Sequence, residues 1–169
     1  MRRKDREVSS FEDIMEIVNH CDVCRVVIND GDFPYIIPMN FGTEIVNKQL
    51  YLYFHSATEG KKIDLFKNNN KVTFEMDCEH NLILYEEEMT CTMCYASVIG
   101  HGIIEPVEEE KKYEALKILM KHYHIEDFDF NTAPIPKTAV FKLTVLDMSA
   151  KRRRNTHTKE KRRENISLY

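Results

Sequence analysis

The chain has 169 residues, of which 43% are apolar and 31% charged, a composition typical of one soluble globular domain. No stretch reaches the roughly 20 apolar residues that span a bilayer, and no apolar segment follows the charged N-terminus, so we expect a cytoplasmic protein that does not enter membranes. Residues 1–150 hold 16 basic and 26 acidic side chains, and this acidic balance argues against nucleic acid as a partner of this part.

The first third of the chain predicts one helix and three strands. Ser9 and Glu12 have the spacing of a capping box, and apolar residues then fall on one helical face, which predicts a helix over residues 11–20. Strands are predicted over residues 23–28, 34–46 and 50–55, because apolar and β-branched runs alternate there with turn residues. Pro38 marks the second strand as an edge strand or the site of a bulge.

The rest of the chain alternates in the same way. A short helix ends at the Asn68–Asn70 run. The other predicted elements are strands over 71–77, 92–107 and 139–148, a strand fragment over 82–85, and a helix over 108–122. Hairpin-length turns favour an antiparallel arrangement, so the predicted fold class is mainly β, a six-stranded barrel with helices outside it. No glycine fingerprint of a dinucleotide fold or a P-loop is present.

We predict one domain over residues 1–150 and a basic C-terminal tail over residues 151–169, which carries 8 basic and 2 acidic residues. A solvated tail is the simplest interpretation. Two alternatives remain open. The tail contacts nucleic acid, or its first residues reach a cofactor phosphate in a second subunit.

The segment from His55 to Lys62 is the strongest candidate site. A strand ends at His55 and Ser56, a turn with Gly60 follows, and Lys61 and Lys62 open a helix. Backbone N–H groups at a helix start favour an anion, and the lysines add positive charge, so the segment is suited to a phosphate monoester. Two solvated lysines on a loop are the alternative.

His55 has two interpretations. It stacks on or hydrogen-bonds to a ring ligand and titrates near neutral pH, or it is a half-exposed residue of an aromatic strand.

Five cysteines include two C-x-x-C pairs, Cys21 with Cys24 and Cys91 with Cys94. The long separation of the pairs disfavours a zinc site, and neither pair opens a helix after a strand as a redox motif does. We therefore expect no metal and reduced thiols that act as small apolar side chains.

Three segments together resemble a known group of proteins. Residues 34–42, 50–62 and 95–102 are similar to the nitroimidazole-resistance family, whose members are flavin-binding split barrels related to pyridoxamine 5′-phosphate oxidase. The resemblance covers residues 1–148 and is most specific from Phe54 to Lys62. It implies a six-stranded antiparallel split β-barrel that forms a homodimer with FMN, or with FAD as the alternative, at the subunit interface.

The resemblance also implies a role for each residue of the cofactor site. Met39 and Asn40 would lie along the flavin ring, and Ser97 would contact the cofactor, in one arrangement from the partner subunit. The remaining implied residues lie near the ribityl chain and phosphate: His55, Ser56, Gly60, Lys61 and Lys62.

Two departures qualify the resemblance. Lys61 stands where the oxidases favour arginine. A lysine keeps the positive charge but cannot form the two parallel hydrogen bonds that a guanidinium gives to a phosphate. The oxidases' C-terminal substrate-binding segment has no counterpart, so oxidation of pyridoxamine phosphate is not expected.

The function implied is an FMN-dependent oxidoreductase that reduces small aromatic, nitroimidazole-like substrates, with His55 as the candidate for proton delivery. The alternative is a non-catalytic module that stores flavin or haem, in which His55 or His101 serves as an iron ligand.

Overall fold

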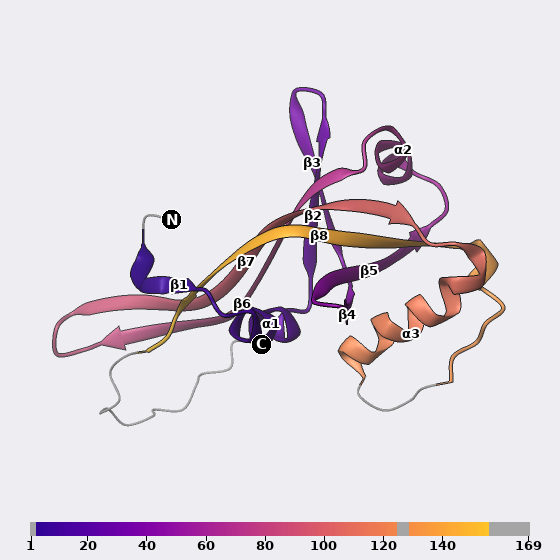
Figure 1. Cartoon of the computed structure of the whole chain (residues 1–169). Coiled ribbons are helices and arrows are strands. Elements are labelled where there is room, and N and C mark those ends of the chain that lie inside the picture. The colour runs from indigo at the N-terminus through magenta and orange to yellow at the C-terminus, as the bar shows by residue number, and fades with distance from the viewer. Residues whose placement is uncertain (1–2, 125–128, 156–169) are drawn as a thin grey trace.

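The structure is a computed structural model that describes residues 3–124 and 129–155 (Figure 1). Its helices are α1 (Phe11–His20), α2 (Lys61–Asn68) and α3 (Lys112–Tyr123), with single 3₁₀ turns at Lys4–Arg6, Glu109–Lys111 and Ile135–Lys137. Its strands are β1 (Glu7–Val8), β2 (Cys24–Asp30), β3 (Phe33–Met39), β4 (Gly42–Val46), β5 (Gln49–Ala57), β6 (Lys71–Tyr85), β7 (Thr90–Pro106) and β8 (Thr138–Arg153).

All strand pairs are antiparallel, and the sheet has the order β3-β2-β6-β7-β8-β5-β4, with β1 added beside β8. The predicted fold class, a mainly β antiparallel split barrel with few helices, is confirmed. The described residues form eight strands where six were predicted, because β1 was missed and the predicted strand over residues 34–46 is two strands. Those two, β3 and β4, are the opposite edges of the sheet, and Asn40 and Phe41 alone join them.

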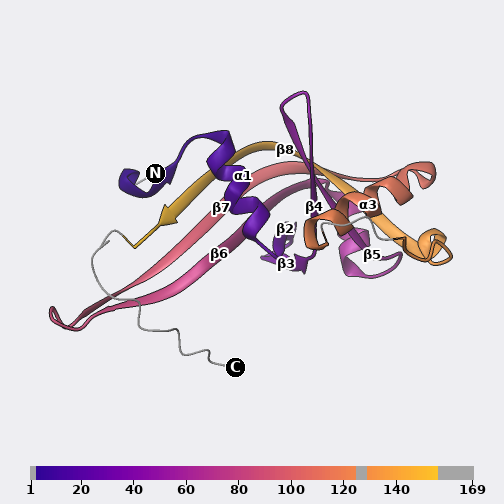
Figure 2. The same ribbon diagram turned by 90° about the horizontal axis from the view of Figure 1, so that it is seen from below.

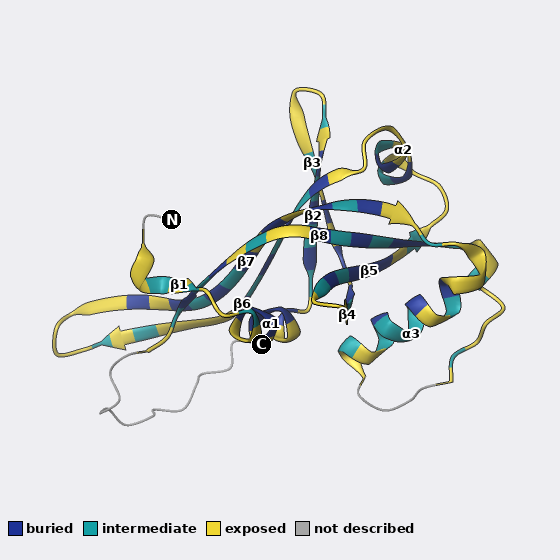
Figure 3. Ribbon diagram, in the orientation of Figure 1, coloured by how far each residue is buried: buried dark blue, intermediate teal, exposed yellow. Residues whose placement is uncertain are grey.

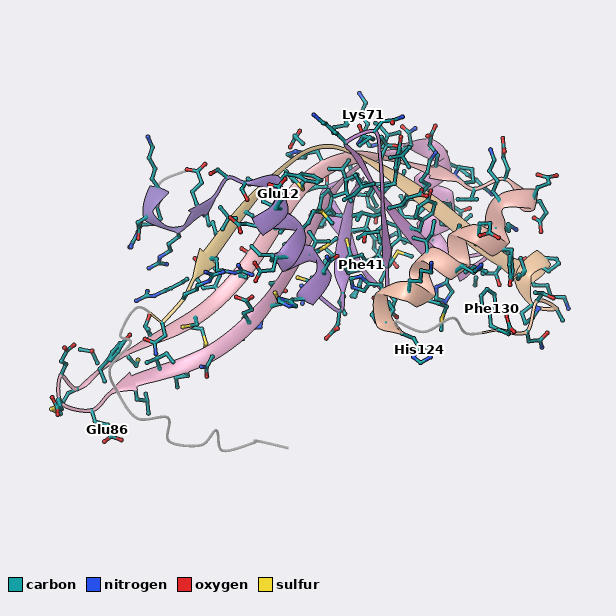
Figure 4. The ribbon with its side chains drawn as sticks, turned by 60° about the horizontal axis from the view of Figure 1, so that its bottom comes forward. Glu12, Phe41, Lys71, Glu86, His124 and Phe130 are labelled. Carbon is teal, nitrogen blue, oxygen red and sulfur yellow. The ribbon has the colours of Figure 1, made fainter. Side chains whose placement is uncertain are left out.

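Helix α3 anchors this link. The Phe41 N–H donates to the Tyr123 hydroxyl at 2.9 Å, and the fully buried Phe41 ring lies 4.3 Å from the His122 ring centroid (Figure 4). Beside it, a Cβ on Gly42 would overlap the backbone of Leu119, so α3 packs directly against the start of β4. A side chain at position 42 would push the helix away from the barrel.

Helix α1 covers the other side of the molecule, where it crosses β6 and β7 (Figure 2). Its inward face is apolar and buried, with Ile17 and Val18 almost fully excluded from solvent. The predicted bounds of this helix are confirmed. The N-cap is Ser10 and not Ser9, since the Ser10 Oγ accepts the Asp13 N–H at 3.0 Å.

Strands β6 and β7 continue past the barrel as an extended hairpin. A bulge lies between Cys78 and Asn81, and within it Glu79 adopts a left-handed φ of 59°. Beyond the bulge, residues 81–94 form a projection, here called the arm, whose tip is exposed (Figure 3). The predicted strand and strand fragment over 71–77 and 82–85 are therefore parts of one strand.

Strand β8 is also longer than predicted and includes Lys151, Arg152 and Arg153, which the sequence placed in the tail. The Arg152 side chain is only 5% exposed and donates to Glu16 on α1 and to Glu79 in the bulge, the latter at 2.8 Å. Two carboxylates thus hold this basic residue in the sheet. Residues 156–169 of the predicted tail lie outside the described residues.

The helices of the described residues are too short or too polar to span a bilayer.

We predict that R152M lowers the free energy of unfolding by about 2 kcal/mol, because hydrogen bonds to charged groups contribute about 1.5–3 kcal/mol each and the acids are partly solvated. Urea unfolding measures the change. The control is R154M, since Arg154 is 67% exposed and 3.9 Å from Glu16, where an ion pair contributes under about 1 kcal/mol. Equal losses in both variants would contradict a structural role for Arg152.

Candidate functional site

Strand β5 and helix α2 meet at the predicted phosphate site. His55 and Ser56 lie at the end of β5, across from Val140 and Ala139 of β8. Gly60 then forms the N-cap of α2 with φ 120° and ψ 167°, a conformation that favours glycine, and it has no side chain to cap the helix. A ligand therefore has access to the N–H groups that open this helix. His55, Ser56, Gly60, Lys61 and Lys62 are here called the β5–α2 cluster.

The two lysines of the cluster have different surroundings. The Lys61 ammonium forms an ion pair with Asp30 at the end of β2 and lies 5.1 Å from the centroid of the Tyr35 ring. Lys62 is half-buried and has no ion pair within the described residues. Lys62 is therefore the uncommitted cation of the cluster. Asp30 is a residue that sequence reasoning missed, since its nearness to α2 depends on how the β2–β3 hairpin stands beside the helix.

His55 lies on the surface of the barrel next to Lys62. Reduced hydration of its ring, followed by repulsion from the Lys62 ammonium, lowers the pKa of His55. The neutral imidazole therefore persists to lower pH than in an ordinary histidine. Ser56 completes this side of the cluster, with its hydroxyl donating to the carbonyl of Ala57 at 2.8 Å.

Met39 and Asn40 approach β5 from the opposite edge of the sheet. Gly42 pairs with Tyr53, two residues before His55, so the link 40–41 and His55 border the same part of the barrel wall. Met39 is 6% exposed and its side chain belongs to the core cluster. The Asn40 amide is exposed and lies 3.4 Å from the Asp22 carbonyl.

Ser97 is far from the β5–α2 cluster of its own chain. Along β8, His55 is opposite Val140, whereas Ser97 of β7 is opposite Lys151. At about 3.3 Å per residue, these positions are separated by about 35 Å along the strand. Figure 1 shows β8 as one extended strand between them. Within one protomer, Ser97 cannot contact a mononucleotide bound at the cluster.

The cysteines fit the apolar interpretation. Cys21 and Cys24 lie in the core, and burial raises the pKa of both thiols, so they stay protonated at neutral pH. Cys91 of the second pair is exposed on the arm and Cys94 is buried.

Among the described residues, the side chains close enough to share a metal ion are Glu16, His20 and Glu79. The Arg152 guanidinium already binds both of these carboxylates, which makes the group a structural ion-pair network.

A shallow hollow of about 620 Å³ lies at the base of the arm, away from the β5–α2 cluster. Its lining residues are Glu79, His80, Asn81, Cys94, Arg153, Arg154 and Asn155.

Comparison with protein families gives a match to the family described as pyridoxamine 5′-phosphate oxidase, over residues 10–152. The chain belongs to this family. The match extends over the barrel and nearly to the end of β8. A comparison with curated proteins found no match.

Solved structures agree with this assignment. The "putative 5-nitroimidazole antibiotic resistance protein" of Bacteroides thetaiotaomicron is 31% identical with a TM-score of 0.74, over 86% of this chain and 85% of that one. The flavocytochrome Anf3 of Azotobacter vinelandii is 17% identical with a TM-score of 0.71, over 92% and 72%. The FAD and heme binding protein of Mycobacterium smegmatis is 15% identical with a TM-score of 0.72, over 87% and 73%. The last two show a shared fold only.

We predict that the pKa of His55, followed by NMR of its ring, lies below the ordinary value of about 6.5. Inorganic phosphate should raise this pKa, because a bound anion stabilises the imidazolium. K62M should also raise it in phosphate-free buffer by removing the nearby charge, whereas K67M, at the other end of α2, should not. A pKa unaffected by both phosphate and K62M would remove His55 from the cluster.

Proposed function

We propose that the chain is a cytoplasmic FMN-binding oxidoreductase that acts as a homodimer and reduces small aromatic, nitroimidazole-like compounds. The observation that supports it best is the β5–α2 cluster, where an uncapped helix start, an uncommitted lysine and a neutral histidine lie together. FAD is the alternative cofactor, since both flavins carry a phosphate on the ribityl chain.

The residues present fit the phosphate of a flavin. A Cβ at Gly60 would meet no atom within 4 Å, so the space in front of the helix start is open. N–H groups, a positive helix end and Lys62 all favour negative charge there. Lys61 is held by Asp30, so it contributes to anion binding only by leaving or sharing that partner.

When bound, the flavin supplies the electron transfer, and the protein contributes position, charge and protons. Lys62 and the start of α2 would hold the phosphate. The lowered pKa of His55 favours its neutral form, whose one N–H and one lone pair would allow the ring to relay a proton toward the reduced acceptor. The sequence holds no separate nicotinamide-binding motif, so a nicotinamide donor would have to bind transiently beside the flavin itself.

Two features of the described residues support a homodimer. Ser97 lies too far along the sheet to serve the cluster of its own chain. The arm also exposes an apolar face built from the cross-strand pairs Leu82–Met93 and Leu84–Cys91, with Leu84 62% exposed. A hairpin with such a face is suited to lie on another subunit.

A haem-binding module is the second candidate, because one histidine is arranged as an iron ligand would be. His101 Nδ1 lies 2.8 Å from Asp147 Oδ1, so Nε2 is the ring nitrogen that would bind the iron. Metal-binding histidines commonly hold a carboxylate in this way. Two structural neighbours carry haem by their names, a flavocytochrome and a FAD and heme binding protein.

We predict that K61A/K62A weakens FMN binding at least tenfold, since charge-assisted hydrogen bonds contribute about 1.5–3 kcal/mol each. Quenching of flavin fluorescence measures the affinity. K62A alone should weaken binding more than K61A, because Asp30 already holds Lys61. K67A is the control at the other end of the helix. Retention of FMN by the double variant as tight as in the unmodified protein would reject the phosphate assignment.

The spectrum of the purified protein separates the two candidates. We expect the two-band yellow spectrum of flavin, bleached anaerobically by NADH or NADPH and restored by a nitroimidazole. If NADH or NADPH bleaches the flavin but the nitro-compound does not reoxidise it, the protein would be a flavin carrier and not a reductase. A Soret band lost in H101A would favour haem instead.

A further inference from the structure

An ion pair joins the start of α2 to the end of β2. The Lys61 ammonium binds the carboxylate of Asp30, and the same ammonium lies 5.1 Å from the centroid of the Tyr35 ring. Asp30 is the last residue of β2 and pairs with Phe33 across the turn of the β2–β3 hairpin. The hairpin therefore fixes the backbone from which this carboxylate reaches α2.

The Asp30 carboxylate occupies the place of an anion on Lys61. Carboxylate and phosphate oxygens are both acceptors, and both take charge-assisted hydrogen bonds from an ammonium. The pair is open to a ligand, since the Lys61 side chain is 56% exposed and that of Asp30 is 29% exposed. Because Asp30 is held in the β2–β3 ladder, it stays beside Lys61 as a permanent competitor for any anion that binds there.

The other donors at the start of α2 have no such competitor. The first backbone hydrogen bond of the helix runs from the Ile63 N–H to the Gly60 carbonyl at 2.9 Å, so the N–H groups before it have no helical partner. The Lys62 ammonium forms no ion pair within the described residues. An anion can therefore bind at the start of α2 while Asp30 still withholds Lys61 from it.

The affinity that a ligand loses in this way depends on the charge of its phosphate. A terminal phosphate, as in FMN, carries a charge of about −1.5 to −2 near neutral pH, since its second pKa is about 6. Each phosphate in the pyrophosphate of FAD carries a single charge, and riboflavin has no phosphate. Because Coulomb energy is proportional to the product of the charges, a freed Lys61 would attract FMN most, FAD less and riboflavin least.

We propose that Asp30 is a specificity-determining residue of the cofactor site, which withholds Lys61 from the ligand phosphate and so lowers the affinity for FMN more than the affinity for FAD. This inference rests on the proposed flavin function and names the residue that sets the balance between its two candidate cofactors. Asp30 acts against one ligand rather than for the other, which is a common origin of specificity.

Replacement of the carboxylate by an amide of the same size tests the proposal. An exposed ion pair corresponds to a factor of about five at most, so D30N should bind FMN about fivefold and FAD about twofold more tightly, with riboflavin unchanged. Dialysis of the protein against equal concentrations of the three flavins, followed by chromatography of the bound flavin, measures the relative affinities. Bound FMN should rise about two- to threefold relative to FAD and about fivefold relative to riboflavin.

The matched control is D32N, and circular dichroism checks that each variant folds. Asp32 is exposed two residues beyond Asp30 and forms no ion pair within the described residues, so D32N removes the same charge without freeing Lys61. A double-mutant cycle with K61M isolates the contact. In K61M, D30N should shift the FMN:FAD ratio no more than D32N shifts it in the unmodified protein, because no ammonium is left to release.

The outcomes separate this inference from the function on which it rests. An unchanged FMN:FAD ratio in D30N, an equal shift in D32N, or a full shift by D30N in K61M would each overturn the role of Asp30 and leave the flavin function standing. An unmodified protein that retains no flavin would overturn the function and the inference together.

Discussion

The ladder that joins β8 to β5 and β7 fixes the distance between the two surfaces that matter most in this protein. One continuous strand carries Val140 opposite His55 at one end and Lys151 opposite Ser97 at the other. A hydrogen-bonded strand of this length cannot fold back on itself, so the two surfaces stay apart in every conformation that preserves the sheet. Arg152 secures the far end of the strand by its contacts with Glu16 and Glu79. A single site that uses both surfaces therefore requires two chains.

Much of the fold could be predicted from the sequence because its signals are local. The apolar face of α1, the turn residues 29–32 and the alternation in β6 each depend on neighbours a few positions away. The division of residues 34–46 into two edge strands was not predictable in this way. It depends on α3, about 80 residues later, whose Tyr123 receives the Phe41 N–H and whose Leu119 packs on Gly42.

The charges at the end of the domain also have structural roles that the local sequence does not reveal. Four basic residues in a row, 151–154, have the composition of a solvated tail, and hydropathy alone gives no reason to extend the strand. The partners that hold Arg152 lie 136 and 73 residues away. Successive residues of β8 point to opposite faces of the sheet. Arg152 therefore faces α1, while Lys151 and Arg153 face outward. A run of like charges in sequence is thus two different surfaces in the fold.

The candidate site was predictable in its location and only partly in its electrostatics. The strand end, the glycine turn and the two lysines identify a place for an anion, but Asp30 makes those lysines unequal. An acidic body of this kind repels a phosphate at long range, so binding depends on short-range donors at one place. Lys62 and the N–H groups at the start of α2 are the donors that the cluster offers to an anion. Because Asp30 pairs with Lys61, the attraction of the cluster for an anion depends mainly on Lys62 and the start of α2.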